Sequence, residues 1–180
     1  CQYYQLGIYP MYNKIITIGD IHGDYNIFIH ILQKNNLINK EKNWIGKNTH
    51  VVQLGDILDR KNRENDLTDD EDNELTIISL IFKLQIQSYM AGGGFHMIIG
   101  NHEIMNIMGI FEYVSPLGIK HFGSIKKRRE FFKAGNEFCK YLACSWNVII
   151  KIGTIIFCHG GITSSIATHY NIKQINLIMR

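Results

Sequence analysis

The sequence predicts an α/β fold, in which the strands of a sheet alternate with covering helices. Two features of the chain indicate this. Short apolar, β-rich runs alternate with segments of helical periodicity, and four of the runs end in a cluster of Gly with Asp, Asn or His. A chain of 180 residues, 46% hydrophobic and 19% charged, can bury a substantial core, which excludes a disordered tail, a collagen-like chain and a disulfide miniprotein. We expect one domain over residues 1–180.

The strands are expected at four apolar runs. In order, these are residues 14–18 (KIITI), 49–54 (THVVQL), 95–99 (FHMII) and 154–158 (TIIFC). The fourth run is preceded by residues 147–152 (NVIIKI), and Gly153 between them supplies permissive backbone for a tight connection. Residues 147–158 therefore predict a β-hairpin.

Helical spacing of apolar residues predicts the covering helices. They are expected at residues 24–37, at residues 75–86 before a glycine stop, and at residues 126–143, where Gly135 and Asn136 can divide the helix. The basic run at residues 126–129 (KKRR) is expected to form a solvated helix face. Residues 61–73 are strongly polar and are expected to form a solvated loop.

Composition argues against a nucleic-acid partner and a membrane span, and favours a reducing compartment. A net charge of +3 is too mild to indicate a nucleic-acid partner, and no apolar run reaches the ~20 residues of a membrane span. The four cysteines lack CxxC pairs, which predicts free thiols and a reducing, cytoplasmic location. The chain begins at Cys1 rather than Met and stops at Arg180 after an apolar stretch, so we expect both ends to be cut.

Candidate metal ligands follow the predicted strands. Asp20 and His22 follow the first strand, Asp56 the second, Asn101 the third and His159 the fourth. In open α/β sheets, ligands bind beyond the carboxyl ends of the strands. If the first strand continues through Asp20 and His22, both side chains point to one side and can share an ion. Carboxylate, imidazole and amide ligands suit a divalent ion such as manganese, iron or zinc.

Three further residues suggest the reaction. A carboxylate such as Asp56 can bridge two ions, and two-metal sites clamp the attacking and leaving oxygens of a phosphoryl displacement. His102 is expected to be the general acid and Asp59 its orienting partner, while Arg60 offers a planar fork for phosphate oxygens. The residues therefore predict phosphoester hydrolysis.

The ordered motifs GDIHGD, GDILDR, GNHE and HGG resemble those of metallophosphoesterases of the phosphoprotein phosphatase type. GNHEIMNIMGIFEYVS and the later RREFF and IIFCHGGI segments are most similar to the Shewanella-like branch of that family. The resemblance covers Ile15 to Thr163. It implies a four-layer α/β/β/α sandwich, here C-terminally incomplete, and hydrolysis by a metal-bridging water or hydroxide without a phosphoenzyme.

The resemblance also implies roles for individual residues. It implies two divalent ions, the first held by Asp20, His22 and Asp56 and the second by Asp56, Asn101 and His159. His102 and Asp59 would form the catalytic pair, and the phosphate would meet Arg60, Asn101 and, from the RREFF segment, Arg129. The remaining histidines without motif partners are expected to be structural or at the surface: His30, His50, His96 and His121.

Two features depart from the family's pattern. Lys61 follows Arg60 where the family usually has Gly, and no Arg- and His-containing motif follows HGG before Arg180. Three functions therefore remain open: a phosphatase acting on phosphoserine, phosphothreonine or phosphotyrosine in proteins, a hydrolase of small phosphoesters such as dinucleoside polyphosphates or cyclic nucleotides, and a catalytically impaired module that binds metal or phosphate. The sequence identifies no regulatory subunit.

Overall fold

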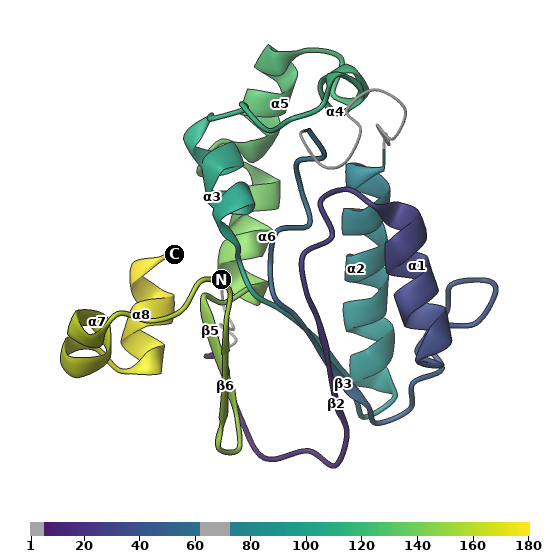
Figure 1. Ribbon diagram of the computed structural model, residues 1–180, viewed down its shortest axis with the longest axis vertical. Helices are drawn as coiled ribbons and strands as arrows, with labels where there is room; N and C mark the ends of the chain where they lie inside the picture. The colour runs from purple at the N-terminus through teal and green to yellow at the C-terminus, as the bar shows by residue number, and fades with distance from the viewer. Residues whose placement is uncertain (1–5, 62–72) are drawn as a thin grey trace.

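Two three-stranded sheets face one another in the computed structural model, which describes residues 6–61 and 73–180 (Figure 1). The first sheet is parallel, in the order β2 (Ile15–Ile18), β3 (His50–Gln53), β4 (Gly94–Met97). The second is mixed, in the order β1 (Ile8–Tyr9), β5 (Ile149–Ile152), β6 (Ile155–Cys158), with β1 parallel and β6 antiparallel to β5.

Alternation along the strands divides the core into two parts. On β3, Val51 joins a large core with the helices α1 (Tyr25–Lys34) and α2 (Glu74–Met90), whereas Val52 turns toward the second sheet. Successive side chains of a strand point to opposite faces of the sheet, so a strand that is buried on both faces contributes to both parts of the core. The helix α6 (Glu137–Ser145) packs beside α2.

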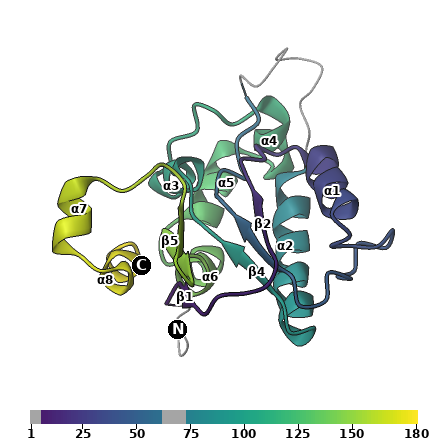
Figure 2. The same cartoon turned by 60° about the horizontal axis from the view of Figure 1, so that its bottom comes forward.

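A fourth layer covers the outer face of the second sheet. The helix α8 (Ile172–Ile178) contacts β5, and it follows the short α7 (Ser164–His169) on the same side (Figure 2). The layers therefore run from α1 and α2 through the two sheets to α8. The predicted α/β fold class with α/β/β/α layers is confirmed.

Most predicted elements are confirmed, with bounds that differ by a few residues: α1 is shorter than predicted and α2 is longer. The four predicted strands and the hairpin are present, and the helix predicted at residues 126–143 is divided into α5 (Ile125–Phe132) and α6 at Gly135, whose φ is +88°. The short helices α3 (Asn101–Met108) and α4 (Pro116–His121) were not predicted, because six to eight residues carry too little periodicity. Residues 62–72 of the predicted polar loop lie outside the described residues.

Two expectations need correction. Arg128 does not lie on a solvated face: its side chain is fully buried, while Arg129 beside it is exposed. Cys139 and Cys158 are free thiols as expected, but Cys144 is disulfide-bonded. Among the described helices, none is long and apolar enough to cross a membrane.

Candidate active site

Loops at the carboxyl ends of β2, β3, β4 and β6 meet at one place. The β3 and β4 loops approach so closely that two glycines are required. A Cβ on Gly55 would lie 2.5 Å from the backbone nitrogen of Gly100, and a Cβ on Gly100 would lie 2.1 Å from Oδ1 of Asp56. The glycines of the GD and GNHE motifs therefore allow Asp56 and the start of α3 to occupy one site.

Three of the predicted site residues have left-handed backbone conformations. The φ angles are +46° at His22, +53° at Asp56 and +69° at Asp59. Non-glycine residues adopt this region at a cost of about 1–3 kcal/mol, and such residues cluster at functional sites. The expectation that the first strand runs through Asp20 and His22 is therefore wrong. The strand ends at Ile18, and the turn brings His22 Nε2 to 3.8 Å from Asp20 Oδ2.

Asp56 lies between two clusters of potential metal ligands. One cluster contains His22, Asp56 and His102, and the other contains Asp20, Asp56 and His159. Within each cluster, the ligand atoms lie within 4.8 Å of one another. Asp56 is buried, whereas the side chain of Asp20 is 50% exposed and can reach an ion from the solvent side.

Hydrogen bonds to backbone carbonyls orient two histidine rings. Nδ1 of His22 lies 2.9 Å from the carbonyl oxygen of Leu58, and Nδ1 of His159 lies 2.9 Å from that of Leu54. A carbonyl only accepts, so in the neutral ring each Nδ1 carries the proton and each Nε2 is an acceptor. Such outer contacts fix the tautomer and orientation of a metal-binding histidine.

Three potential ligand atoms that meet at His159 suit the binding of a cation. Its Nε2 lies 2.9 Å from Oδ1 of Asn101 and 3.2 Å from Oδ2 of Asp56. In the neutral ring all three atoms are acceptors, so they repel one another unless a positive charge lies among them. A divalent ion satisfies all three, and the mixture of imidazole, carboxylate and amide ligands suits manganese, iron or zinc.

His102, a member of the first cluster, forms a buried pair with Asp59. Nδ1 of His102 lies 2.8 Å from Oδ2 of Asp59, and both side chains are buried. The opposite nitrogen, Nε2, lies 3.9 Å from Oδ2 of Asp56 and therefore faces the metal ligands. Asn106, one turn further along α3, donates to both carboxylate oxygens of Asp59 at 2.9 and 3.0 Å.

Glu103 holds the backbone of the Asp56 loop, a role that the sequence did not reveal. Its carboxylate accepts three hydrogen bonds, from the backbone N–H groups of Gly100, Asp56 and Ile57 at 2.8, 2.8 and 3.0 Å. Burial raises the pKa of Glu103 to about 7, the Asp56 carboxylate adds to the rise, and the three N–H donors oppose it. In the sequence, the position of Glu103 within the GNHE motif was the signal that could have indicated this role.

The two arginines that were predicted to bind phosphate have different neighbours. Arg60 follows the Asp59 turn and pairs with Asp24, with 3.2 Å between Nη1 and Oδ2. Arg129 lies at the far end of α3 from Asn101, beside Gly109, with its guanidinium carbon 5.8 Å from the Phe111 ring centre. The structure thus brings Arg60 next to the site loops and leaves Arg129 at its periphery.

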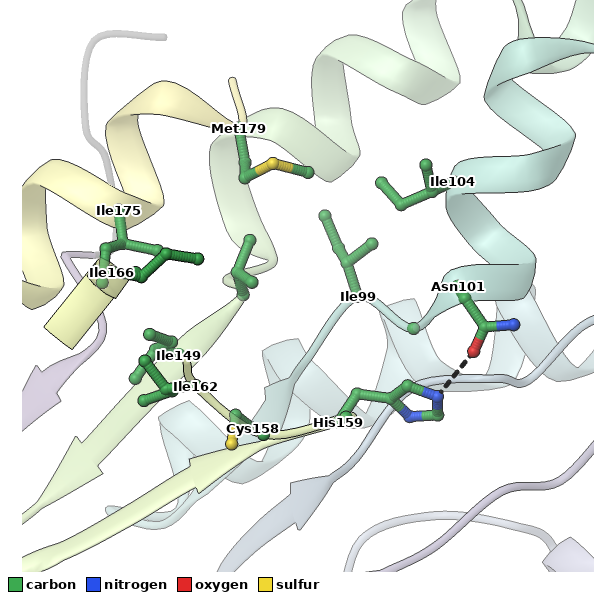
Figure 3. Close-up of a pocket in the computed structure, with 14 residues that line it drawn as sticks. Ile99, Asn101, Ile104, Ile149, Cys158, His159, Ile162, Ile166, Ile175 and Met179 are labelled. Atoms are coloured by element: carbon green, nitrogen blue, oxygen red, sulfur yellow. Dashed lines mark hydrogen bonds between the residues drawn. The ribbon is translucent and has the colours of Figure 1, made fainter. Parts of the chain in front are cut away.

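An apolar pocket of about 310 Å³ adjoins the metal ligands (Figure 3). Asn101 and His159 lie at one end of it, where the dashed line in Figure 3 joins Oδ1 of Asn101 to Nε2 of His159. Isoleucines from the β4 loop, α3 and α8 supply much of the remaining wall, including Ile99, Ile104 and Ile175. The second ligand cluster therefore borders on an apolar surface.

Comparison with known proteins shows the family of this chain. Residues 13–180 match the model of the calcineurin-like phosphoesterase family. The chain is 34% identical over 169 residues to a Plasmodium berghei protein named Shewanella-like protein phosphatase 1, covering 93% of this chain and 44% of the relative. It is 38% identical over 109 residues to Shewanella-like protein phosphatase 2 of Arabidopsis thaliana, covering 61% of this chain and 25% of that protein.

Solved structures show the same fold. The cold-active protein tyrosine phosphatase of a psychrophilic Shewanella species superposes with a TM-score of 0.81 at 26% identity, covering 98% of this chain and 51% of the other. A mutant cold-active protein tyrosine phosphatase gives the same TM-score of 0.81 at 25% identity, covering 98% and 51%. The chain thus spans about half the length of these relatives or less. It belongs to the calcineurin-like phosphoesterase family.

Proposed function

We propose that this chain carries the catalytic centre of a metal-dependent phosphoester hydrolase that acts on phosphorylated proteins. The observation that carries the proposal is the convergence of two ligand clusters on Asp56, with the His102–Asp59 pair directed at the same carboxylate. Metal-assisted hydrolysis requires ligands, a proton donor and phosphate-binding groups at one place, and family membership supports all three.

The ligand clusters would hold two divalent ions. Asp20, His22 and Asp56 are assigned to the first ion, because Oδ2 of Asp20 lies 3.8 Å from Nε2 of His22, although Asp20 also clusters with His159. Asn101 and His159 join Asp56 around the second ion. Such ions supply Lewis-acid activation of the attacking water and neutralise charge on the phosphoryl oxygens. His102 belongs by distance to one cluster, but its hydrogen bond to Asp59 favours a role in proton transfer.

His102 is assigned as the general acid. The Asp59 carboxylate holds the Nδ1 proton at 2.8 Å, which leaves Nε2 directed at the ligand clusters. A carboxylate in this position fixes the ring's orientation and tautomer. The Nε2 proton can then pass to the leaving oxygen as that oxygen separates from phosphorus.

Phosphate binding is assigned to Arg60, Asn101 and Arg129. The Asp24 carboxylate restrains the guanidinium of Arg60 near the site, and a planar guanidinium can bind two phosphate oxygens at once. Asn101 contributes from the first residue of α3, where backbone N–H groups also favour an anion. Arg129 would meet the substrate at the periphery of the site.

The substrate class rests on the names of relatives. Two relatives are named protein phosphatases and the solved homologues are titled protein tyrosine phosphatases. From these names we infer that the present chain prefers phosphomonoesters on protein side chains. Phosphoserine, phosphothreonine and phosphotyrosine all remain within the proposal.

The test measures hydrolysis by the purified full-length protein with added manganese. Phosphopeptides containing each phosphorylated residue are compared with dinucleoside polyphosphates and cyclic nucleotides. We expect kcat/KM to favour a phosphopeptide by at least about tenfold, which corresponds to about 1.4 kcal/mol of differential transition-state binding. A preference for the nucleotides would show a small-phosphoester hydrolase, and stoichiometric metal binding without turnover would show an impaired binding module.

A further inference from the structure

Arg128 is a buried cation directly behind the His102–Asp59 pair. It lies on α5 and its side chain has no solvent exposure. Its guanidinium is enclosed by three aromatic rings, with the Phe122, Phe132 and Phe111 centres 4.9, 5.1 and 5.9 Å from the guanidinium carbon. Fully buried charges are rare and require partners.

The guanidinium donates to three side chains through separate nitrogens, and also to the carbonyl oxygen of Gly118 at 3.3 Å. Nη2 donates to Oδ1 of Asp59 at 3.1 Å, Nε donates to Oδ1 of Asn106 at 2.8 Å, and Nη1 donates to Oε2 of Glu74. Glu74 in turn accepts the backbone N–H of Asp59 at 2.7 Å. Arg128 therefore forms a hydrogen bond with Asp59 directly. It also binds Glu74, which accepts the backbone N–H of Asp59, and Asn106, which donates to the carboxylate of Asp59.

These contacts determine the orientation of the Asp59 carboxylate. Oδ1 accepts from Arg128 and Asn106, while Oδ2 accepts from His102 and Asn106. With Oδ1 fixed by the arginine, Oδ2 is the oxygen directed at the imidazole. The side-chain amide of Asn106 is fixed as well, because its oxygen accepts from Arg128 and its nitrogen donates to Asp59.

The buried charges of the group also depend on Arg128. Asp59 and Glu74 are two buried carboxylates, and Arg128 is the buried cation that pairs with both. Without Arg128, two uncompensated carboxylates would lie behind the imidazole, which is strongly unfavourable in a buried site.

We propose that Arg128 is the positioning residue of the His102–Asp59 pair, and that Glu74 and Asn106 connect it to Asp59. The proposal rests on the proposed function, in which His102 gives its Nε2 proton to the leaving oxygen. The bond from phosphorus to that oxygen breaks while water adds to phosphorus, and the products are the alcohol or phenol and inorganic phosphate. Arg128 acts on this step only through Asp59.

The kinetic test uses leaving groups of different basicity. The full-length, manganese-loaded protein is assayed with two esters. Phenyl phosphate has a basic leaving oxygen, which must be protonated as it departs, whereas the weakly basic leaving oxygen of 2,4-dinitrophenyl phosphate departs readily without a proton. We expect Arg128→Lys, which keeps the charge and loses the fork, to lower kcat for phenyl phosphate at least about tenfold more than for the dinitrophenyl ester. Lys127→Met on the exposed side of α5 is the matched control and should change neither rate.

A double-mutant cycle separates positioning from folding. In the His102→Asn background, Arg128→Lys should have no further effect on phenyl phosphate hydrolysis, because both changes act on one proton transfer. If Arg128→Lys fails to fold, Arg128→Met combined with Glu74→Gln removes a positive and a negative charge together and serves in its place. Equal loss with both esters, or additive loss in the cycle, would overturn the proposal.

A spectroscopic readout keeps this proposal distinct from the proposed function. In metal-free protein with ¹⁵N-labelled histidine, the Nδ1 proton of His102 should resonate far downfield because Asp59 accepts it, and His102→Asn identifies the signal. We expect Arg128→Lys to shift or broaden this signal while Lys127→Met leaves it unchanged. If the wild type shows the signal but no hydrolysis, the proposed function fails. An unshifted signal in folded Arg128→Lys contradicts the positioning role.

Discussion

Nδ1 of His102 lies 2.8 Å from Oδ2 of Asp59, and the opposite nitrogen of the same ring faces Asp56 across 3.9 Å. The imidazole ring of His102 therefore lies between the carboxylates of Asp59 and Asp56. We expect His102→Asn to lower kcat for a phosphotyrosine peptide by about 10²–10⁴, the usual contribution of a general acid.

Metal content distinguishes this role from ligation. His102→Asn should retain the metal stoichiometry of the wild type, measured by atomic absorption after gel filtration. His30→Asn, on the exposed side of α1, is the matched control and should change neither rate nor metal. Loss of an ion in His102→Asn would instead place His102 among the ligands, as the cluster with His22 and Asp56 also allows.

Asp56 belongs to both ligand clusters, whereas Asp20 belongs to one. We therefore expect Asp56→Asn to lose both ions and all measurable hydrolysis, because an amide supplies a single neutral donor where a carboxylate can bridge. Asp20→Asn should weaken the binding of one ion more than that of the other. Calorimetric titration with manganese measures the binding of both ions in each variant. Glu112→Gln at the surface is the control. Equal losses in the two variants would argue against Asp56 as the shared ligand.

Glu103 accepts three backbone N–H groups from the two loops that meet at Gly55 and Gly100. Glu103→Gln replaces one acceptor oxygen by a donor, so at least one buried N–H loses its partner. The free energy of unfolding should fall by about 1–3 kcal/mol, the cost of an unsatisfied buried group. Urea unfolding at constant pH measures the change, and Glu137→Gln, which is exposed, should leave the midpoint unaltered.

The sequence predicted the strand ends well because their chemistry is local. Gly followed by Asp, Asn or His after an apolar run indicates both a strand end and a ligand, and the first three strands pair in parallel so that their ends coincide. The convergence of Asp20 and His22 was correctly expected, but through a wrong geometry. A left-handed turn at His22 brings them together, not strand alternation.

Residues that act through tertiary contacts could not be predicted. Arg128 looked like one member of a solvated basic run, since nothing in KKRR marks the residue that turns inward. Its burial depends on Glu74, which is 54 residues away along the chain, and on the aromatic rings of α5 and its neighbours. Helical spacing does place Asn106 one turn from His102, so that contact was accessible in principle.

Arg60 is restrained by Asp24, which also caps α1 by accepting the N–H of Ile27 at 2.8 Å. We expect Arg60→Ala to lower kcat/KM for phosphopeptides by about 10- to 100-fold, because a charge-assisted hydrogen bond contributes about 1.5–3 kcal/mol. Asp24→Asn keeps the cap and removes the charge that restrains Arg60, so its effect should be smaller. Competition by inorganic phosphate gives an independent measure of anion binding. A larger defect in Asp24→Asn than in Arg60→Ala would contradict the assignment.

His96 and His50 form a buried pair between the sheets, away from the site loops, with 3.0 Å between Nε2 of His96 and Nδ1 of His50. The Tyr9 ring lies 4.4 Å from the His96 ring, and the Tyr12 ring stacks on His50 at 3.3 Å. Burial, and then the neighbouring His50, lower the pKa of His96 from 6.5 to about 4. Between these two pH values the unfolded chain binds a proton at His96 that the folded chain does not.

Stability should therefore fall as the pH decreases from 6.5 to about 4, and should be independent of His96 above that range. The loss attributable to His96 is about 3 kcal/mol, since each pKa unit corresponds to about 1.36 kcal/mol. Urea unfolding at pH values across this range should show a shallower decline in His96→Gln than in the wild type. His30→Gln, which removes an exposed imidazole, should follow the wild-type curve. Parallel curves for His96→Gln and the wild type would show that His96 titrates normally in the folded protein.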